Sequence, residues 1–382
     1  GHVPAKQYGK DHPEYYSLRG GTRRPGNWLC TSNPDMQRIF GDAVAAQVAD
    51  KGVTSISISP PDGRGYCECE HCRALDDPDY REPSSGHVVM TDRYMRFFHV
   101  VAARALAANP KAIVNFYAYA DYSRPPLHAE KAPENLCAWI APIRYCRFHS
   151  LSNPICSERQ RLRGEIDQWQ QVVAKRGWRE YKYNLAETVV PLSKISVWKD
   201  DIPYLHRQGC IGLNIECLYF WHLYGPHTYL VTELAWDADA DVDAIMADFY
   251  EKFCGPAAPH VRAYWERIDE AYRTTDIHVG SFYGLHVVWT PQLVEACRAD
   301  LDAAAKAADT DLIRKRVAMF RDGLRNVEYY LNLRDATNRC DFAAAKKIYD
   351  EWVAHMDRVH KEKIHYIGEY KHGYAPRFLS KS

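Results

Sequence analysis

Four carboxylates and one arginine stand directly after apolar, strand-like segments of this sequence. They are Asp62, Asp121, Arg144, Glu187 and Glu216. In parallel sheets, and above all in α/β barrels, the groups that do chemistry sit at the carboxyl ends of the strands. Two carboxylates around one small cavity can cleave a glycosidic bond: one protonates the leaving oxygen, and the other acts as nucleophile, base or orienting group. The pattern therefore indicates a sugar-hydrolysing site, although each acid alone could be a surface residue or a helix cap.

Three of these acids are the predicted catalytic residues: Asp62, Glu187 and Glu216. Glu187 and Glu216 directly follow apolar strands, where an unpaired carboxylate would be costly without a role. Asp62 follows Pro60-Pro61, which ends a β-rich run because proline cannot donate to a sheet ladder. We expect one acid to protonate the leaving group and another to orient the substrate, without assigning which does which.

Several neighbouring side chains are suited to holding a sugar, because tyrosine and tryptophan combine a flat apolar face with a polar edge. Arg144 could meet a substrate carboxylate or hydroxyl, or could form a salt bridge with one of the acids. Asn184 could hold a polar substituent or satisfy a loop backbone. The predicted substrate-binding residues are His2, Tyr117, Tyr119, Arg144, Tyr183, Asn184, Tyr219 and Trp221.

Cys67, Cys69 and Cys72 form the one tight cluster among 12 cysteines. Tetrahedral zinc needs four ligands, and this cluster offers three thiols without a second cysteine pair at matching spacing. Zinc, a local disulfide and a loop of buried thiols all remain open, and no partnering base marks a catalytic thiol. We expect no metal and no cofactor, with these three cysteines as the ligands if a metal does bind.

Composition excludes several other functions. The 382 residues carry 49 basic and 49 acidic side chains, so no cationic excess favours binding to the phosphates of nucleic acid. No apolar run is long enough to span a bilayer, and no signal peptide opens the chain. The glycine-rich nucleotide loops and the serine-hydrolase elbow are also missing from the sequence.

Alternating strand and helix patterns predict βαβ units and a parallel sheet. The predicted strands are 53–59, 113–119, 136–143, 181–186 and 210–215. A helix is predicted before the first strand, at 35–51, and others between the strands at 91–109, 158–176 and 195–208. Only helical patterns follow, at 241–253, 260–272, 291–308, 312–333 and 342–364. We expect an α/β fold: a (β/α)8 TIM-barrel-like domain over 1–240, complete or lacking its first strands, and an α-helical domain over 241–382.

Several motifs resemble domain-of-unknown-function family 4838. The resemblance runs through most of the chain to about residue 270 and rests on His12-Pro13-Glu14-Tyr15-Tyr16, Cys30-Thr31-Ser32-Asn33-Pro34, Ser59-Pro60-Pro61-Asp62-Gly63, Cys67-Glu68-Cys69-Glu70-His71-Cys72 and Cys254-Gly255-Pro256. Some members of that family are placed in glycoside hydrolase family 163, which acts on N-glycans. Its architecture is similar to that of the family 20 hexosaminidases and family 67 α-glucuronidases.

The resemblance implies a retaining, endo-β-N-acetylglucosaminidase-like hydrolase with a glycan substrate and a secreted or periplasmic location. It implies that Asp62 follows the fourth barrel strand and that Glu216, on the last strand, is a candidate acid. Glu187 matches no catalytic motif of the family. Three alternatives remain open: a carbohydrate-binding protein without catalysis, a uronic-acid-directed glycosidase that uses Arg144, and a structural fragment whose open sheet edge pairs with another chain.

Overall fold

The computed structural model describes residues 3–50, 52–128, 130–218, 220–280 and 283–362. The chain divides into two compact units. The first consists of Gly1–Arg144, Leu162–Glu180 and Gly209–Asn214, and the second of Tyr145–Arg161, Tyr181–Gln208 and Ile215–Ser382. The boundary that the sequence predicts near residue 240 is a different division, and it stays a prediction.

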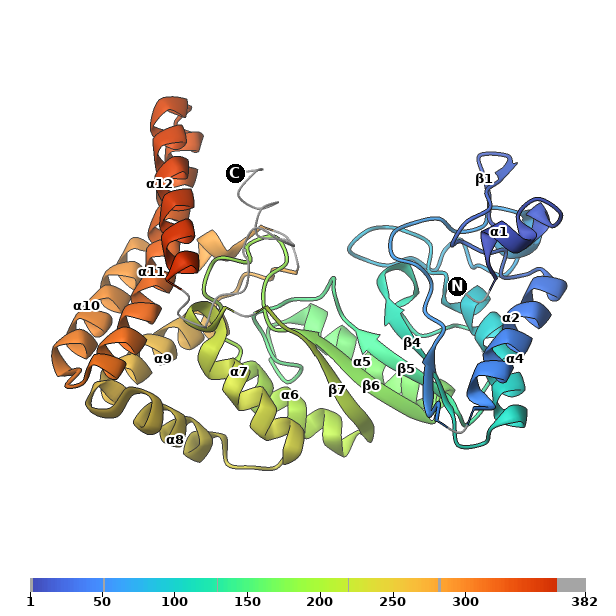
Figure 1. Cartoon of the computed structure of the whole chain (residues 1–382), viewed down its shortest axis with the longest axis horizontal. Coiled ribbons are helices and arrows are strands. Elements are labelled where there is room, and N and C mark those ends of the chain that lie inside the picture. The colour runs from blue at the N-terminus through green and yellow to red at the C-terminus, as the bar shows by residue number, and fades with distance from the viewer. Residues whose placement is uncertain (1–2, 51, 129, 219, 281–282, 363–382) are drawn as a thin grey trace. The chain divides into compact units, whose positions relative to one another are not determined.

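A parallel, curled five-stranded sheet supplies the framework of the first unit (Figure 1). Its strands pair in chain order: β3 (Ser55–Ser57), β4 (Ile113–Tyr119), β5 (Leu136–Ala141), β6 (Lys175–Tyr181) and β7 (Cys210–Glu216). The pairs β3–β4, β4–β5 and β5–β6 are parallel. The register places Tyr117 opposite Trp139 and Trp139 opposite Gly177. A side chain on Gly177 would collide with the Trp139 ring, so glycine at this position makes room for the indole.

The strand predicted at 181–186 is misplaced, because β6 runs over Lys175–Tyr181. The preceding helix, α5 (Ser157–Val172), ends before residue 176, where the sequence pattern had placed its end. Strand β6 is hard to recognise in the sequence because two of its buried residues, Arg176 and Glu180, are charged. A pattern of hydrophobic residues does not predict buried charged side chains. As a result Asn184 and Glu187 lie in the irregular segment after β6 rather than in a strand or at its immediate end.

Two helices of the first unit pack against each other, α2 (Pro34–Val48) and α4 (Thr91–Ala108), and they lie side by side in Figure 1. The Asn33 side chain caps α2 by accepting from the Met36 backbone N–H, and Pro34 suits the first helical position. Phe40 of α2 meets Phe97 of α4 with ring centroids 5.0 Å apart. Four shorter elements of this unit were not predicted from the sequence: α1 (Ala5–Tyr8), β1 (Leu18–Arg19), β2 (Thr22–Arg23) and α3 (Glu70–Arg73).

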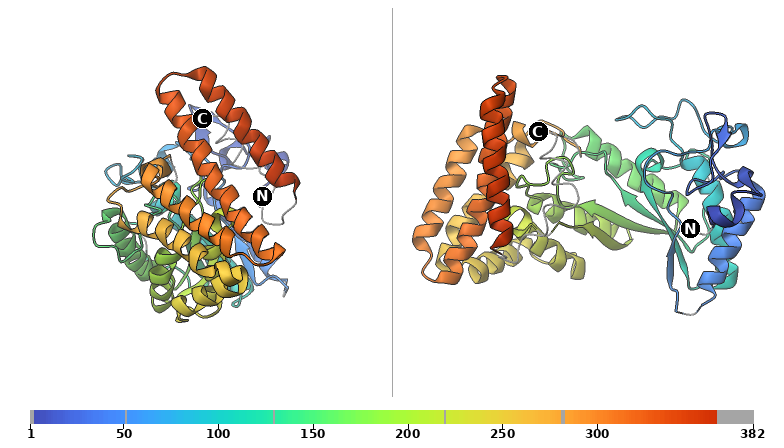
Figure 2. Two further views of the ribbon diagram at one scale, coloured as in Figure 1. Left: turned by 90° about the vertical axis from the view of Figure 1, so that its left-hand side faces the viewer. Right: turned by 45° about the horizontal axis from the view of Figure 1, so that its top comes forward.

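The second unit is mainly helical, as the sequence predicts for the C-terminal region. Its helices are α6 (Ile195–Arg207), α7 (Trp221–Trp236), α8 (Val242–Cys254), α9 (Ala258–Thr274), α10 (Pro291–Ala307), α11 (Asp311–Asn338) and α12 (Phe342–Lys361). The long helices α11 and α12 pack against each other, as the left view of Figure 2 shows. Trp352 of α12 is fully buried and donates to the Asn326 side chain of α11 over 2.9 Å.

A mixed α/β fold with a parallel sheet and a helical C-terminal region is therefore confirmed. Within the described residues this sheet has five strands, so closure into an eight-stranded barrel stays a prediction. Among the same residues, no helix is both long enough and apolar enough to cross a membrane.

Candidate functional site

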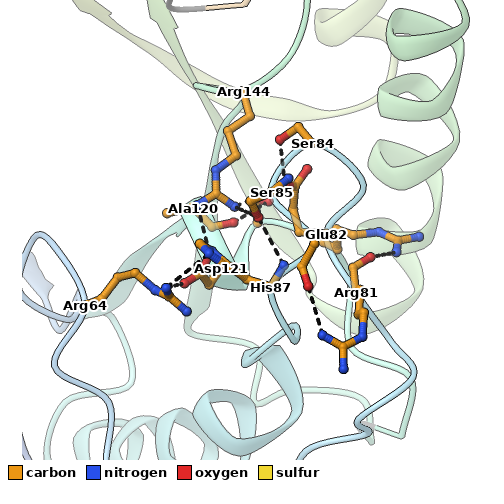
Figure 3. Close-up of polar contacts among 12 residues, drawn as sticks. Arg64, Arg81, Glu82, Ser84, Ser85, His87, Ala120, Asp121 and Arg144 are labelled. Carbon is orange, nitrogen blue, oxygen red and sulfur yellow. Dashed lines mark hydrogen bonds and ion pairs between the residues drawn. The ribbon is translucent and has the colours of Figure 1, made fainter.

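The first unit holds a connected set of polar side chains beyond β4 and β5, which we call the Asp121 network: Arg64, Glu82, His87, Asp121 and Arg144 (Figure 3). The Asp121 side chain has no exposed surface. Its Oδ1 accepts from Arg144 Nη2 at 2.8 Å and from His87 Nδ1 at 3.0 Å, and its Oδ2 accepts from Arg64 Nε at 3.0 Å. Both carboxylate oxygens are thus occupied by cationic or N–H donors.

A strained turn places Asp121. Ala120, the residue after β4, has φ +51°, a left-handed conformation that costs a non-glycine residue roughly 1–3 kcal/mol. A hydrogen bond stabilises this turn: the Met90 backbone N–H donates to the Asp121 carbonyl oxygen over 2.8 Å. Strain of this kind clusters at functional positions, so the turn agrees with a role for the network beyond packing.

Arg144 links Asp121 to a second buried carboxylate, Glu82. Arg144 Nη1 lies 3.2 Å from Glu82 Oε2, which also accepts from the Ser84 hydroxyl and the Ser85 backbone. Arg144 therefore forms salt bridges with acidic side chains, which is one of the two roles that the sequence suggested for it. Arg144 nevertheless keeps 19 % of its side chain exposed.

Charge dominates both carboxylates of the network. Burial alone would raise the pKa of Asp121, but hydrogen bonds from Arg144 and His87 and the charges of Arg144 and Arg64 outweigh it and lower the pKa. Burial likewise opposes ionisation of Glu82, and hydrogen bonds from Ser84 and Ser85 with the Arg144 charge lower its pKa. Both acids are therefore ionised at neutral pH, and Asp121 positions cations rather than donating a proton.

Asp121→Asn is expected to lower the free energy of unfolding at pH 7 by about 1–3 kcal/mol, because it removes the buried counter-charge of the mostly buried Arg144 and weakens the hydrogen bonds from the more exposed Arg64 and His87. Because the pKa of Asp121 is lower in the folded state than in the unfolded state, the ionised carboxylate stabilises the fold at pH values above the unfolded-state pKa. This stabilisation is lost as pH falls through the folded-state pKa. The deficit of the variant should therefore shrink in acid. Urea unfolding at pH 7 and at pH 3 measures it. Asp62→Asn is the matched control, since Asp62 is exposed; an equal loss in the control would contradict the prediction.

In the second unit, Glu187 is fully enclosed. Its Oε2 accepts from the backbone N–H groups of Gly284 and Leu285, each at 2.9 Å, and its Oε1 accepts from the Tyr330 hydroxyl. Burial raises the pKa of Glu187, and these hydrogen bonds oppose the rise without cancelling it. The carboxylate ties the loop at 284–285 to helix α11, and its catalytic role stays a prediction.

Glu216, the last residue of β7, is only partly buried. The hydroxyl of Tyr183, itself buried, donates to Glu216 Oε1, and the Lys182 backbone N–H donates to the Glu216 carbonyl over 3.4 Å. The Lys182 ammonium donates to Thr228 Oγ1 over 2.9 Å, and burial lowers its pKa. Glu216 therefore combines a fixed orientation with access to solvent, which a carboxylate needs to act on a substrate.

Three other predicted residues have the following surroundings. Asp62 is exposed and accepts from the Gly63 backbone N–H over 3.1 Å. Asn184 satisfies loop backbones, donating to the Gly280 carbonyl and accepting from the Ala186 N–H, which is the second of its two predicted roles. Trp221 is the first residue of α7 and is partly buried.

Two predicted tyrosines lie at β4 in the first unit. The Tyr117 hydroxyl accepts from the Asn214 side chain at 3.1 Å, and the Arg179 guanidinium lies 5.0 Å from the Tyr117 ring centroid. Tyr119 meets Tyr122 edge to face, with ring centroids 6.4 Å apart. His2 and Tyr219 lie outside the described residues.

The structure thus joins Asp121 with Arg144 in the first unit and Glu216 with Tyr183 in the second. Sequence reasoning missed Arg64, Glu82 and His87, because they lie in the long segment between β3 and α4 and follow no strand directly. No signal in the sequence marks them as partners of Asp121.

Two groups of side chains could hold a metal ion. The four-cysteine cluster consists of Cys30, Cys67, Cys69 and Cys72, and the Cys2His2 cluster consists of Cys146, His149, Cys156 and His278. Within each group, one ligand atom per residue lies within 4.8 Å of the others. The first group contains the three candidate cysteines of the sequence analysis and adds Cys30, which was not predicted.

Comparisons with family models, curated proteins and solved structures show what this chain is similar to. A mutant of the O-GlcNAc hydrolase of Thermobaculum terrenum is 8% identical, with a TM-score of 0.42 over 94% of this chain and 76% of that chain. A search of curated proteins finds no match. The model of a domain of unknown function, DUF4838, matches residues 1–266, as the sequence motifs had indicated. Because this match spans well over half of the chain, the protein belongs to the DUF4838 family.

Proposed function

We propose that this protein is a glycoside hydrolase that retains anomeric configuration and acts on N-acetylglucosamine-containing glycans, in the manner of an endo-β-N-acetylglucosaminidase. The observation that carries the proposal is Glu216, a partly exposed carboxylate at the carboxyl end of β7 that Tyr183 orients. The resemblance of the sequence to family members with this activity supports the choice of substrate. We also propose that the curled sheet belongs to a (β/α)8 barrel.

In this proposal Glu216 is the acid that protonates the leaving oxygen as the glycosidic bond breaks. The acetamido oxygen of the substrate attacks the anomeric carbon from the other side, so the protein need not supply a nucleophilic carboxylate. Water then opens the cyclic intermediate, and Glu216, now ionised, takes a proton from that water. Tyr183 supports both steps because its buried hydroxyl donates to one carboxylate oxygen and so fixes the orientation of the carboxyl group.

The proposal is tested by incubating the full chain with an N-glycoprotein and with a chromogenic N-acetylglucosaminide and measuring released sugar. Release of the glycan with retained configuration supports the proposal. A thiazoline analogue of the cyclic intermediate should inhibit if the acetamido group participates. A panel of uronic-acid glycosides is tested beside these substrates, since the Arg144 side chain is only partly buried. Turnover of uronides alone would replace the proposed substrate class.

A carbohydrate-binding protein without hydrolysis is the second candidate. The observation that favours it is the enclosure of Glu187, whose two oxygens are both occupied by protein donors. Such a protein would bind oligosaccharide in a calorimeter and release no sugar from any substrate of the panel. Binding with no turnover would therefore decide between the two functions.

A further inference from the structure

We propose that the four-cysteine cluster is a structural zinc site. The proposal concerns the stability of the first unit, and it holds or fails independently of the glycosidase assignment. Cys30 precedes α2, Cys67 and Cys69 lie in the loop before α3, and Cys72 lies on α3. All four side chains are buried, although the two chain segments that carry them are separated by helix α2 and strand β3.

The spacing of the sulfur atoms fits a tetrahedron around zinc. With Zn–S bonds of about 2.3 Å, the sulfur atoms of a tetrahedral site are about 3.8 Å apart. The Sγ atom of Cys30 lies 3.6 Å from that of Cys69 and 3.8 Å from that of Cys72. A disulfide would need about 2.05 Å, and all four cysteines are free. Apolar packing of thiols does not require four of them to converge on one point.

The surroundings of the sulfurs suit thiolates. The Leu18 backbone N–H donates to Cys67 Sγ over 3.3 Å, and Arg23 Nη1 lies 3.6 Å from the same sulfur. The Ser32 hydroxyl lies 3.0 Å from Cys72 Sγ. N–H and O–H donors of this kind orient and stabilise metal-bound thiolates, and the arginine charge offsets part of the negative charge of a zinc ion with four thiolates.

The local fold explains why a metal would be needed here. The chain between α1 and α2 has little regular structure: one short 3-10 turn and the two-residue strands β1 and β2. A segment with so few ladder hydrogen bonds and so small a core is commonly stabilised by a metal or by disulfides. Four protein ligands close the coordination sphere, which is the signature of a structural rather than a catalytic zinc.

A different observation carries a second proposal, that the Cys2His2 cluster of the second unit also binds zinc. Cys146, His149 and Cys156 lie within one segment, and His278 comes from the loop after α9. His149 Nδ1 lies 3.3 Å from Cys146 Sγ, close to the separation of about 3.6 Å expected for nitrogen and sulfur ligands of one tetrahedral zinc. The ring centroids of His149 and His278 are 5.2 Å apart.

The tautomer of His149 points to the same conclusion. Its Nε2 lies 2.9 Å from the Thr275 carbonyl oxygen, which can only accept, so Nε2 carries the proton. The lone pair of Nδ1 is therefore directed toward the cluster. A zinc-bound histidine commonly donates its other ring N–H to a backbone carbonyl in this way. Zinc here would fasten the loop at 275–279 to the segment at 146–156.

Metal content of the purified chain tests both sites. The full chain is produced in zinc-supplemented medium and purified under reducing conditions without a metal-affinity step. Its zinc content per chain is then measured by inductively coupled plasma mass spectrometry. Two zinc ions per chain are expected, one for each cluster. Cobalt(II) substitution should give intense thiolate charge-transfer bands that identify sulfur ligands. A wild-type chain without bound zinc, or with the cluster cysteines in disulfides, would overturn the corresponding site.

Variants assign each ion to its cluster. Cys72→Ser and Cys146→Ser are each expected to lower the zinc content from two ions to one. Cys297→Ser is the matched control: this thiol is as buried as Cys72 but belongs to neither cluster, so two ions should remain. Zinc content unchanged by Cys72→Ser overturns the first proposal, and zinc content unchanged by Cys146→Ser overturns the second. If either variant fails to fold, the wild-type zinc count and cobalt spectrum decide.

Discussion

Glu216→Gln is expected to lower kcat for glycan hydrolysis by about 10²–10⁴-fold, the usual contribution of a positioned general acid. The substitution preserves shape, and the Tyr183 hydroxyl can still donate to the side-chain amide oxygen, so the melting temperature should change little. An amide cannot release a proton to the leaving oxygen. The loss should therefore be smaller for substrates with an activated leaving group, such as nitrophenyl glycosides, than for natural glycans.

Two further variants sharpen this test. Tyr183→Phe removes the orienting hydroxyl while Glu216 remains, and it should lower kcat by about tenfold with little change in KM, as for a positioning residue. Asp62→Asn addresses the other predicted acid, which is exposed. If Asp62→Asn abolishes turnover and Glu216→Gln does not, the assignment of the acid is reversed and the proposed fold is unaffected.

The helices could be predicted from the sequence because their burial follows one stripe. Met36, Phe40, Val44 and Val48 of α2 recur at helical spacing and are all buried. The strands were harder, since β6 buries Arg176 and Glu180 where a pattern of apolar residues was expected. Helix α7 was not predicted, because the aromatic residues near its start suggested a surface that stacks on sugar rings. One of these aromatic residues, Tyr224, is instead fully buried in the core.

The candidate sites show a sharper limit. The position of Asp121 and Arg144 after neighbouring strands is what brings them into contact, because a parallel sheet delivers both to one edge. Their role in a functional site stays a prediction. Their partner His87 comes from a loop with no periodic signal. Cys30 could not be joined to the Cys67–Cys72 motif from spacing, since only the fold brings it there. Local sequence patterns report neighbours along the chain, whereas these clusters depend on contacts between distant segments.

Glu187→Ala is expected to lower the free energy of unfolding at pH 7 by about 3–5 kcal/mol. The substitution leaves three buried donors without an acceptor, namely the N–H groups of Gly284 and Leu285 and the hydroxyl of Tyr330, and each unsatisfied donor costs roughly 1–3 kcal/mol. Glu187→Gln should avoid this loss of stability. Its amide oxygen can accept from both backbone groups, while its amide N–H donates to the Tyr330 oxygen.

The pH dependence gives this pair of variants a second readout. Because the folded-state pKa of Glu187 is raised, the stability that it contributes is fully present below the unfolded-state pKa and is lost as pH rises through the folded-state pKa. Glutamine removes that loss, so Glu187→Gln should gain on the wild type as pH rises from 4 to 7 in urea unfolding. A Gln variant as unstable as the Ala variant would contradict the hydrogen-bonding account. Lost turnover in a folded Gln variant would support a catalytic role for Glu187, since the amide keeps the shape of the side chain but cannot transfer a proton.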